Sequence, residues 1–268
     1  KTAQGTKMSG EKRYEQMPVL QAYFLVGPTA AGKSAVAQWI AEKYGYDILA
    51  ADSMQVYRGM NIGTAKPGLQ EQSKVRHLGI DLAGPGEFFS AGAYRKYAVP
   101  VLKAGAAAGR QTIVTGGTGL YIKSLIEGLS PSSAADPSLR AYWTTVLKEK
   151  GIGFLQESLR VRSPETYERI ADRQNARRLI RAFEMVESGA ASRDRNWKNG
   201  RKSLPLAGLT MQADALKTRI AKRVDEMYSA GLIEEVRGLL ENEGVELSDT
   251  ARQAIGYAEA IDLLNGRC

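Results

Sequence analysis

Apolar and polar residues follow two different periods along the first half of the chain. Three short runs of apolar and β-forming residues predict buried strands. Stretches with helical spacing lie between and after these runs, and Ser90 is a suitable N-cap for one of them. Strands that alternate with helices predict a parallel sheet covered on both faces. The expected strands are 21–26, 46–51 and 112–115, the expected helices are 34–43, 90–108 and 118–127, and 53–72 is expected to be a loop.

The pattern changes after Pro131, where helical spacing continues with no strand between the helices. A polar, basic loop follows at 193–202, and the apolar run 204–211 predicts one more core strand. The spacing of 214–241 predicts a long amphipathic helix that Gly231 breaks. The remaining expected helices are 139–150, 154–161, 164–170, 176–188 and 250–264. The sequence therefore predicts a disordered tail at 1–17, an α/β core at 18–139 and 203–268, and a basic helical insertion at 140–202.

Composition narrows the class of protein. One Cys and one His among 268 residues exclude an internal disulfide and the usual structural zinc sites. No apolar run is long enough for a membrane span, and the polar start of the chain predicts no signal peptide, so we expect a cytoplasmic protein without membrane contact. The net charge is +8, and residues 140–202 carry +7 of it. Such a run is either a solvated helical face or a surface that meets phosphates.

The strongest motif is the run from Gly27 to Ser34, which matches the phosphate-binding P-loop of ATP-binding and other nucleotide-binding proteins. Its glycines allow backbone N–H groups to approach phosphate oxygens, and the N-terminus of the following helix adds partial positive charge. Lys33 would add a full charge at the terminal phosphate, and the Ser34 hydroxyl is suited to bind Mg²⁺. The alternative is a glycine-rich turn without a ligand. Every residue of the motif is a candidate for phosphate contact: Gly27, Pro28, Thr29, Ala30, Ala31, Gly32, Lys33 and Ser34.

Asp52 follows the second expected strand, at the sheet edge where parallel sheets bind ligands. Its simple roles would be a Mg²⁺ ligand or a helix cap, and its more specific role would be a general base. A nucleotide kinase would carry more arginines over the transferred phosphoryl group.

Five motifs occur in a fixed order. They are GPTAAGKS from Gly27, DSMQVYRGMNIGTAKP from Asp52, GGTGLYIKSLIEGL from Gly116, RRLIRAFE from Arg177 and RQAIGY from Arg252. Together they resemble the tRNA dimethylallyltransferases, also called tRNA isopentenyltransferases, over residues 21–264. The resemblance implies a P-loop NTPase-like core and transfer of a dimethylallyl group from dimethylallyl diphosphate. The acceptor would be N6 of the adenine immediately 3′ of the anticodon in tRNA. Residues 1–268 hold no zinc-finger motif, so we expect the bacterial type.

The resemblance also implies roles for individual residues. Asp52 would take the N6 proton, Lys33 would stabilise the diphosphate with Mg²⁺, and Thr118 would line the channel where the adenine meets the donor. A simple N-cap is the alternative role for Thr118. Arg181 would reach the diphosphate. The residues implied to contact the anticodon stem-loop are Asp52, Ser53, Met54, Gln55, Thr118, Arg140, Arg177, Arg178, Leu179, Ile180, Arg181, Gln253, Gly256 and Tyr257.

Three other functions remain open from the sequence. An adenylate isopentenyltransferase would share the P-loop and Asp52 but act on a free nucleotide, which needs no basic helical insertion. An RNA-binding protein with a degenerate site would not need intact Lys33, Asp52 and Thr118. A small-molecule kinase is the weakest alternative. Nothing in the sequence demands more than a monomer.

Overall fold

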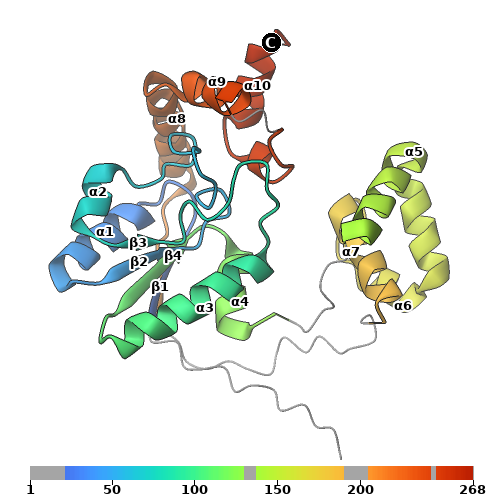
Figure 1. The fold of residues 1–268 in the computed structure, drawn as a ribbon, viewed down its shortest axis with the longest axis horizontal. Helices are drawn as coiled ribbons and strands as arrows, with labels where there is room; N and C mark the ends of the chain where they lie inside the picture. The colour runs from blue at the N-terminus through green and yellow to red at the C-terminus, as the bar shows by residue number, and fades with distance from the viewer. Residues whose placement is uncertain (1–21, 130–136, 190–204, 243–245, 268) are drawn as a thin grey trace, which may run out of the picture. The chain divides into compact units, whose positions relative to one another are not determined.

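A computed structural model describes residues 22–129, 137–189, 205–242 and 246–267 (Figure 1). Contacts divide the chain into two compact units. The first unit comprises residues 1–128 and 202–268, and the second comprises residues 129–201. The expected tail at 1–17 and the expected basic loop at 193–202 lie outside the described residues.

The first unit is built on a five-stranded parallel sheet with the order β3-β2-β4-β1-β5. The three strands expected in the first half of the chain are present, and the expected fourth core strand is the short β5. The sequence pattern missed β3, which has two residues and therefore no period to detect. The strands are β1 Ala22–Val26, β2 Asp47–Ala50, β3 His77–Leu78, β4 Thr112–Gly116 and β5 Leu206–Gly208.

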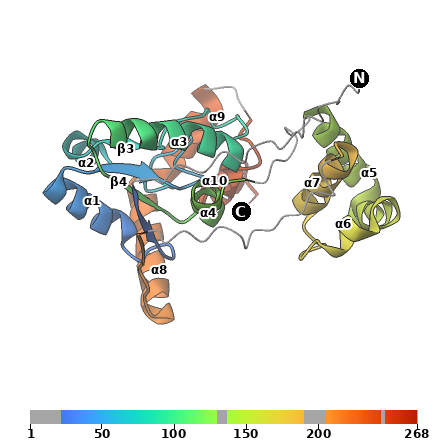
Figure 2. The same ribbon diagram turned by 90° about the horizontal axis from the view of Figure 1, so that it is seen from below.

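Helices cover both faces of this sheet, as the alternating pattern predicts (Figure 2). Successive residues of a strand point to opposite faces. On one face, Leu25 packs with Ala37 and Ala41 of α1. On the other face, Phe24 packs in the cluster that holds Tyr94 of α3 and Tyr121 of α4. The helices of this part are α1 Lys33–Tyr44, α2 Leu69–Lys74, α3 Ala91–Ala107 and α4 Gly119–Glu127.

Three expectations about where helices begin, break or end can be compared with the structure, and two of them are confirmed. Ser90 caps α3, because its side chain accepts the backbone N–H of Ala93. Gly231 separates α8 from α9, with a positive φ of 98° that ends the helix. The expected single helix over 250–264 is wrong, because Ala254 is extended and Gly256 is left-handed, so two short helices form. The C-terminal elements are α8 Ala213–Ser229, α9 Leu232–Asn242, the 3₁₀ helix η1 Ala251–Gln253 and α10 Tyr257–Leu264.

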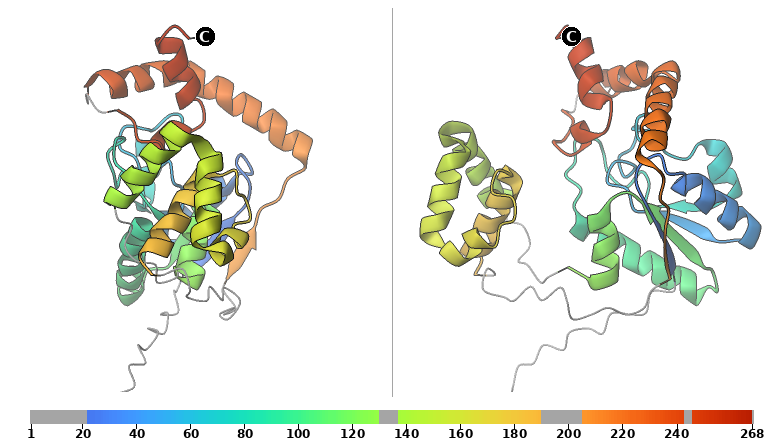
Figure 3. Two further views of the ribbon diagram at one scale, coloured as in Figure 1. Left: turned by 90° about the vertical axis from the view of Figure 1, so that its right-hand side faces the viewer. Right: turned by 180° about the vertical axis from the view of Figure 1, so that it is seen from behind.

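The described part of the second unit is helical (Figure 3). Helix α5 begins before residue 140, the expected start of the insertion, and Gly151 interrupts it with a φ of 76°, so it forms the two helices that the spacing predicts. Trp143 stacks on Phe183 at a centroid distance of 3.6 Å in the core. The helices are α5 Pro137–Arg162, α6 Pro164–Glu168 and α7 Ala176–Glu187.

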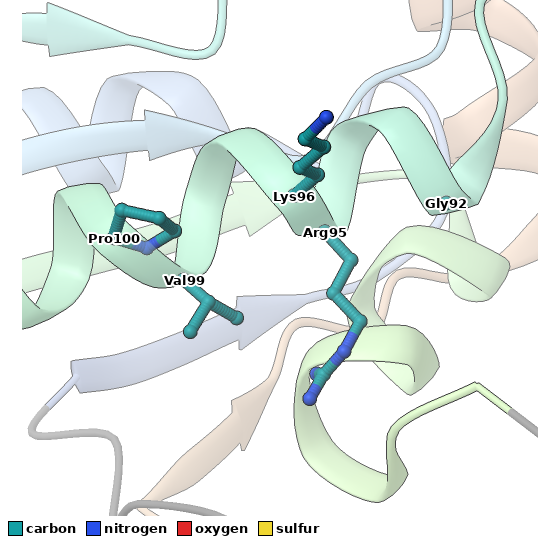
Figure 4. A pocket seen from close by; sticks show the side chains of 5 residues that line it. All are labelled: Gly92, Arg95, Lys96, Val99 and Pro100. Atoms are coloured by element: carbon teal, nitrogen blue, oxygen red, sulfur yellow. The ribbon is translucent and has the colours of Figure 1, made fainter. Parts of the chain in front are cut away.

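Among the described residues, no helix is both long enough and apolar enough to cross a membrane. A shallow pocket of about 340 Å³ lies along α3 (Figure 4). Its polar groups are few, and Arg95 already donates from Nη1 to the backbone carbonyl of Ser124 in α4. The pocket therefore offers few groups for recognising a ligand. Its lining residues are Gly92, Arg95, Lys96, Val99 and Pro100.

Candidate active site

The P-loop connects β1 to α1, as the motif predicts. Gly32 is the N-cap of α1 and has a φ of 94°, a backbone conformation that favours glycine. The loop therefore turns directly into the first helical turn, which carries Lys33 and the exposed Ser34. Its backbone N–H groups and the helix N-terminus together form a site suited to anions.

Lys33 closes the loop on itself, because its Nζ donates to the backbone carbonyl of Pro28 at 2.8 Å. Burial lowers the pKa of Lys33, the negative charge of Asp52 raises it, and the positive charge of Arg223 lowers it. The net shift is downward, since burial dominates. Lys33, Asp52 and Arg223 are therefore close enough to interact electrostatically.

Asp52 follows β2 at the carboxyl edge of the sheet. Its Oδ1 accepts the backbone N–H of Met54 at 2.9 Å, which orients the carboxylate. In the described structure this bond lies within the loop after β2, so Asp52 is not a cap of any helix there. The carboxylate remains a candidate base.

Thr118 ties the ends of β2 and β4 together. Its backbone N–H donates to the carbonyl of Ala51 at 3.1 Å. Its Oγ1 accepts the backbone N–H of Ser53 at 2.9 Å and donates to Ser53 Oγ at 3.2 Å. Thr118 stands at the N-cap position of α4, but its side chain makes no capping hydrogen bond. The structure thus connects Thr118 to the Asp52 loop, and the simple N-cap role is wrong.

Two arginines of α8 lie beside this site, and neither belongs to any of the five sequence motifs. A Cβ atom built on Gly32 would lie 3.9 Å from Nη2 of Arg219, so this guanidinium lies near the P-loop. Burial lowers the pKa of Arg223, while the charge of Asp52 raises it. Arg219 and Arg223 are four residues apart and share one helix face. This four-residue spacing of arginines could have indicated a phosphate-binding face. The apolar residues of the same helix, however, predicted only that the helix packs against the core.

The described residues contain no group of three or more His, Cys, Asp or Glu side chains that could hold a metal ion. The expected metal contact, Ser34, is not of these types. Ser34 is the second residue of α1, directly after Lys33, and its side chain is exposed.

Two of the arginines expected to contact RNA converge on a buried carboxylate in the second unit. Arg140 binds Glu184 with two hydrogen bonds, Nε to Oε1 at 2.7 Å and Nη2 to Oε2 at 3.2 Å. Arg181 binds the same carboxylate at 2.6 Å. Glu184 is 2% exposed, whereas the two arginine side chains are about one-third exposed. Arg177 and Arg178 are exposed in the first turn of α7.

Three residues expected to contact RNA are instead buried. Leu179 and Ile180 belong to the core of the second unit, because they lie on the inner face of α7. Tyr257 is completely buried, and its hydroxyl donates to Glu235. Leu179 and Tyr257 are 0% exposed and Ile180 is 7% exposed, so packing leaves almost none of these side chains for contact with an RNA. Gln253 is exposed and Gly256 is partly exposed in the same segment as Tyr257.

The family model described as IPP transferase matches residues 55–268, a range that begins after the P-loop. A tRNA dimethylallyltransferase from Streptomyces griseus subsp. griseus is 38% identical over 246 residues, which is 91% of this chain and 78% of the relative. One from Pelotomaculum thermopropionicum is 39% identical over 97% of this chain and 82% of the relative.

Solved structures agree with these matches. The full-length tRNA isopentenylpyrophosphate transferase from Bacillus halodurans superposes with a TM-score of 0.63 and 34% identity, over 93% of this chain and 78% of that one. A eukaryotic dimethylallyltransferase acting on tRNA gives a TM-score of 0.75 over 92% of this chain and 64% of that one. At 21% identity, the second match shows the fold alone.

Proposed function

The chain belongs to the IPP transferase family, and we propose that it transfers a dimethylallyl group from dimethylallyl diphosphate to N6 of the adenine immediately 3′ of the anticodon in tRNA. Curated relatives that match most of the chain are tRNA dimethylallyltransferases. They favour this reaction over prenylation of free AMP.

One observation of the structure carries the chemical part of the proposal. A candidate base, Asp52, lies within electrostatic range of two candidate phosphate-binding cations, Lys33 and Arg223. Prenyl transfer needs this combination, because negative charge grows on the departing diphosphate while the attacking nitrogen loses a proton. All three residues belong to the first unit of one chain, so the proposal needs no second copy.

The reaction balances with these groups. The N6 nitrogen forms a bond to C1 of the dimethylallyl group as the bond from C1 to the diphosphate oxygen breaks. The electron pair of that bond leaves with the diphosphate, which the P-loop N–H groups and Lys33 stabilise. Asp52 accepts the proton that N6 loses.

Arg223 would add a second cation at the diphosphate. The Ser34 hydroxyl and phosphate oxygens are hard oxygen ligands of the kind that Mg²⁺ prefers, and a bound ion would stabilise the charge on the diphosphate. Arg181 belongs to the second unit, and its expected contact with the diphosphate stays a prediction.

The acceptor is proposed to bind through two surfaces. Residues 140–202 carry a net charge of +7, which suits the phosphates of an anticodon stem-loop. A base that reacts at N6 must leave its stack, so the adenine would reach the Asp52 loop flipped out of the RNA. Ser53, Met54 and Gln55 would surround it there.

The test is transfer from labelled dimethylallyl diphosphate in the presence of Mg²⁺. Unmodified anticodon stem-loop RNA is compared with AMP as acceptor. We expect label in the RNA and a loss of about 10²–10⁴-fold in kcat for Asp52→Asn, which keeps the side-chain shape but is no base. Asp262→Asn, an exposed change in α10, is the matched control and should leave kcat unchanged. Label in AMP alone would refute the proposed acceptor, and full activity of Asp52→Asn would refute the base.

A further inference from the structure

The segment Asp52–Pro67 has almost no regular secondary structure. Its second half is tied to helix α9 by the side chain of Glu235. One oxygen of this carboxylate, Oε2, accepts the backbone N–H of Asn61 at 2.9 Å and that of Ile62 at 2.8 Å. Hydrogen bonds to an ionised acceptor are stronger than neutral ones. Glu235 therefore fixes the position of a turn that is distant in sequence.

Tyr257 holds Glu235 in turn, because its buried hydroxyl donates to Oε1 of the carboxylate. Burial and this hydrogen bond raise the pKa of Tyr257, so its hydroxyl keeps its proton. The tyrosine ring also packs directly against the turn. A Cβ atom on Gly63 would lie 2.3 Å from Cε2 of Tyr257 and 2.9 Å from Cδ1 of Leu232. The turn thus has no room to move toward α9 or α10.

The fixed turn orients Gln55. Its Nε2 donates to the backbone carbonyls of Thr64 and Ala65, both at 3.2 Å. A carbonyl oxygen can only accept, so these two bonds determine which end of the amide faces the loop. Nε2 thus has its acceptors within the loop, whereas Oε1 of Gln55 has no donor among the described residues and can accept a hydrogen bond from a ligand. An acceptor at this position suits an exocyclic amino group, such as that of adenine, and disfavours a carbonyl.

We propose that Glu235 and Tyr257 are positioning residues for the RNA substrate, which hold the Asn61–Gly63 turn so that Gln55 presents its carbonyl oxygen to the target base. The inference rests on the proposed function, in which Gln55 faces that base. It gives Tyr257 a role through Glu235 rather than through contact with RNA.

The test compares steady-state constants for both substrates. Glu235→Ala removes the acceptor for two charge-assisted bonds, so we expect KM for the stem-loop RNA to rise about tenfold or more. KM for dimethylallyl diphosphate should stay within about twofold, because no hydrogen bond among the described residues joins the P-loop to this turn. Tyr257→Phe should give a smaller rise in the same constant. Glu234→Ala, an exposed change on the same helix, is the control and should leave both constants unchanged.

A double-mutant cycle separates positioning from general stability. If Glu235 acts through Gln55, then Glu235→Ala should raise KM for RNA by less than about threefold when Gln55→Ala is already present. An equal effect in both backgrounds would overturn the inference, as would an equal rise in KM for the donor. Because Glu235→Ala could loosen the fold more widely, Glu235→Gln is tested as well. It keeps an oxygen acceptor and should recover part of the loss.

Amide hydrogen exchange gives a readout that needs no activity. In Glu235→Ala, the amides of Asn61 and Ile62 should exchange faster, while those of the central strand β4 should not change. Unchanged exchange at Asn61 and Ile62 would overturn the inference. The wild-type chain could transfer no label to RNA while Asn61 and Ile62 still exchange faster in Glu235→Ala. In that case the proposed function fails, but the conclusion that Glu235 fixes the Asn61–Gly63 turn stands.

Discussion

Replacing Glu184 with Gln should destabilise the second unit, because its carboxylate is the shared counter-charge of Arg140 and Arg181. The side chain is 2% exposed and accepts three hydrogen bonds of 2.6–3.2 Å. Breaking a buried ion pair by removing one partner costs about 3–5 kcal/mol. Gln keeps the shape of the Glu side chain but leaves the charges of Arg140 and Arg181 without a counter-charge. Its amide NH₂ group also replaces one acceptor oxygen and therefore faces an arginine N–H donor. The arginines are partly exposed, so we expect about 3 kcal/mol, the low end of that range.

Tryptophan fluorescence can follow this unit selectively. Trp143 is 2% exposed and stacks on Phe183, so its emission should change when the unit unfolds. The other two tryptophans, Trp39 and Trp197, are replaced by Phe to leave one reporter. In urea, a loss of about 3 kcal/mol should lower the midpoint by about 1–3 M. Glu157→Gln breaks an exposed pair with Arg160 and serves as the control, with an unchanged midpoint expected.

The direction of the pKa shift at Glu184 determines how the stability difference between wild type and Glu184→Gln changes with pH. Burial by itself would raise the pKa of Glu184, but hydrogen bonds from Arg140 and Arg181 outweigh it, so the pKa lies below its ordinary value. A depressed carboxyl pKa stabilises the fold above the unfolded pKa of about 4.3, and this contribution is lost as the pH falls through the folded value. The difference between wild type and Glu184→Gln should therefore be full at pH 7 and shrink below about pH 4. Equal midpoints at pH 7, or a difference that does not change with pH, would refute the assignment.

Three further predictions concern the first unit. Thr118→Val leaves the backbone N–H of Ser53 without its acceptor, so kcat should fall about 5–30-fold in the transfer assay while KM for the donor changes little. Arg223→Leu should raise KM for dimethylallyl diphosphate at least tenfold and leave KM for RNA nearly unchanged, because a cation at the diphosphate is lost. Lys66→Met removes a nearly buried ammonium bonded to Asp81 and to a backbone carbonyl, so urea unfolding followed by circular dichroism should show a loss of about 2–4 kcal/mol.

Local patterns predicted those parts of the molecule that depend on neighbours in sequence. The P-loop with its strand and helix, the cap at Ser90 and the break at Gly231 each follow from a short run of residues. The sheet was predictable as well, because buried parallel strands have an apolar run that flanking turns delimit. Thr118 was predicted as a site residue, but only the structure showed that it binds Ser53.

Contacts between distant segments were beyond the reach of these patterns. Arg223 has the spacing of a surface residue on an amphipathic helix, and only the fold brings that helix to Asp52. Glu184 stands between Phe183 and Met185 in a helix that alternates charged and apolar residues, and its sequence does not show that two arginines converge on it. Tyr257 and Leu179 occur in motifs associated with RNA, yet packing buries both. Sequence motifs mark a functional segment without separating its contact residues from those that support them.

The strand order has a consequence for the order in which the chain can fold during synthesis. Strand β5 pairs with β1, but it follows the second unit in the sequence, so the sheet stays incomplete until residues 206–208 have been made. The described helices of the second unit, α5 to α7, follow one another in the sequence and pack against one another. Local contacts form faster than distant ones, and translation proceeds at about 5–20 residues per second. The second unit can therefore reach its native contacts before the sheet of the first unit is complete, because β5 is synthesised about 1–4 seconds after α7 at this rate.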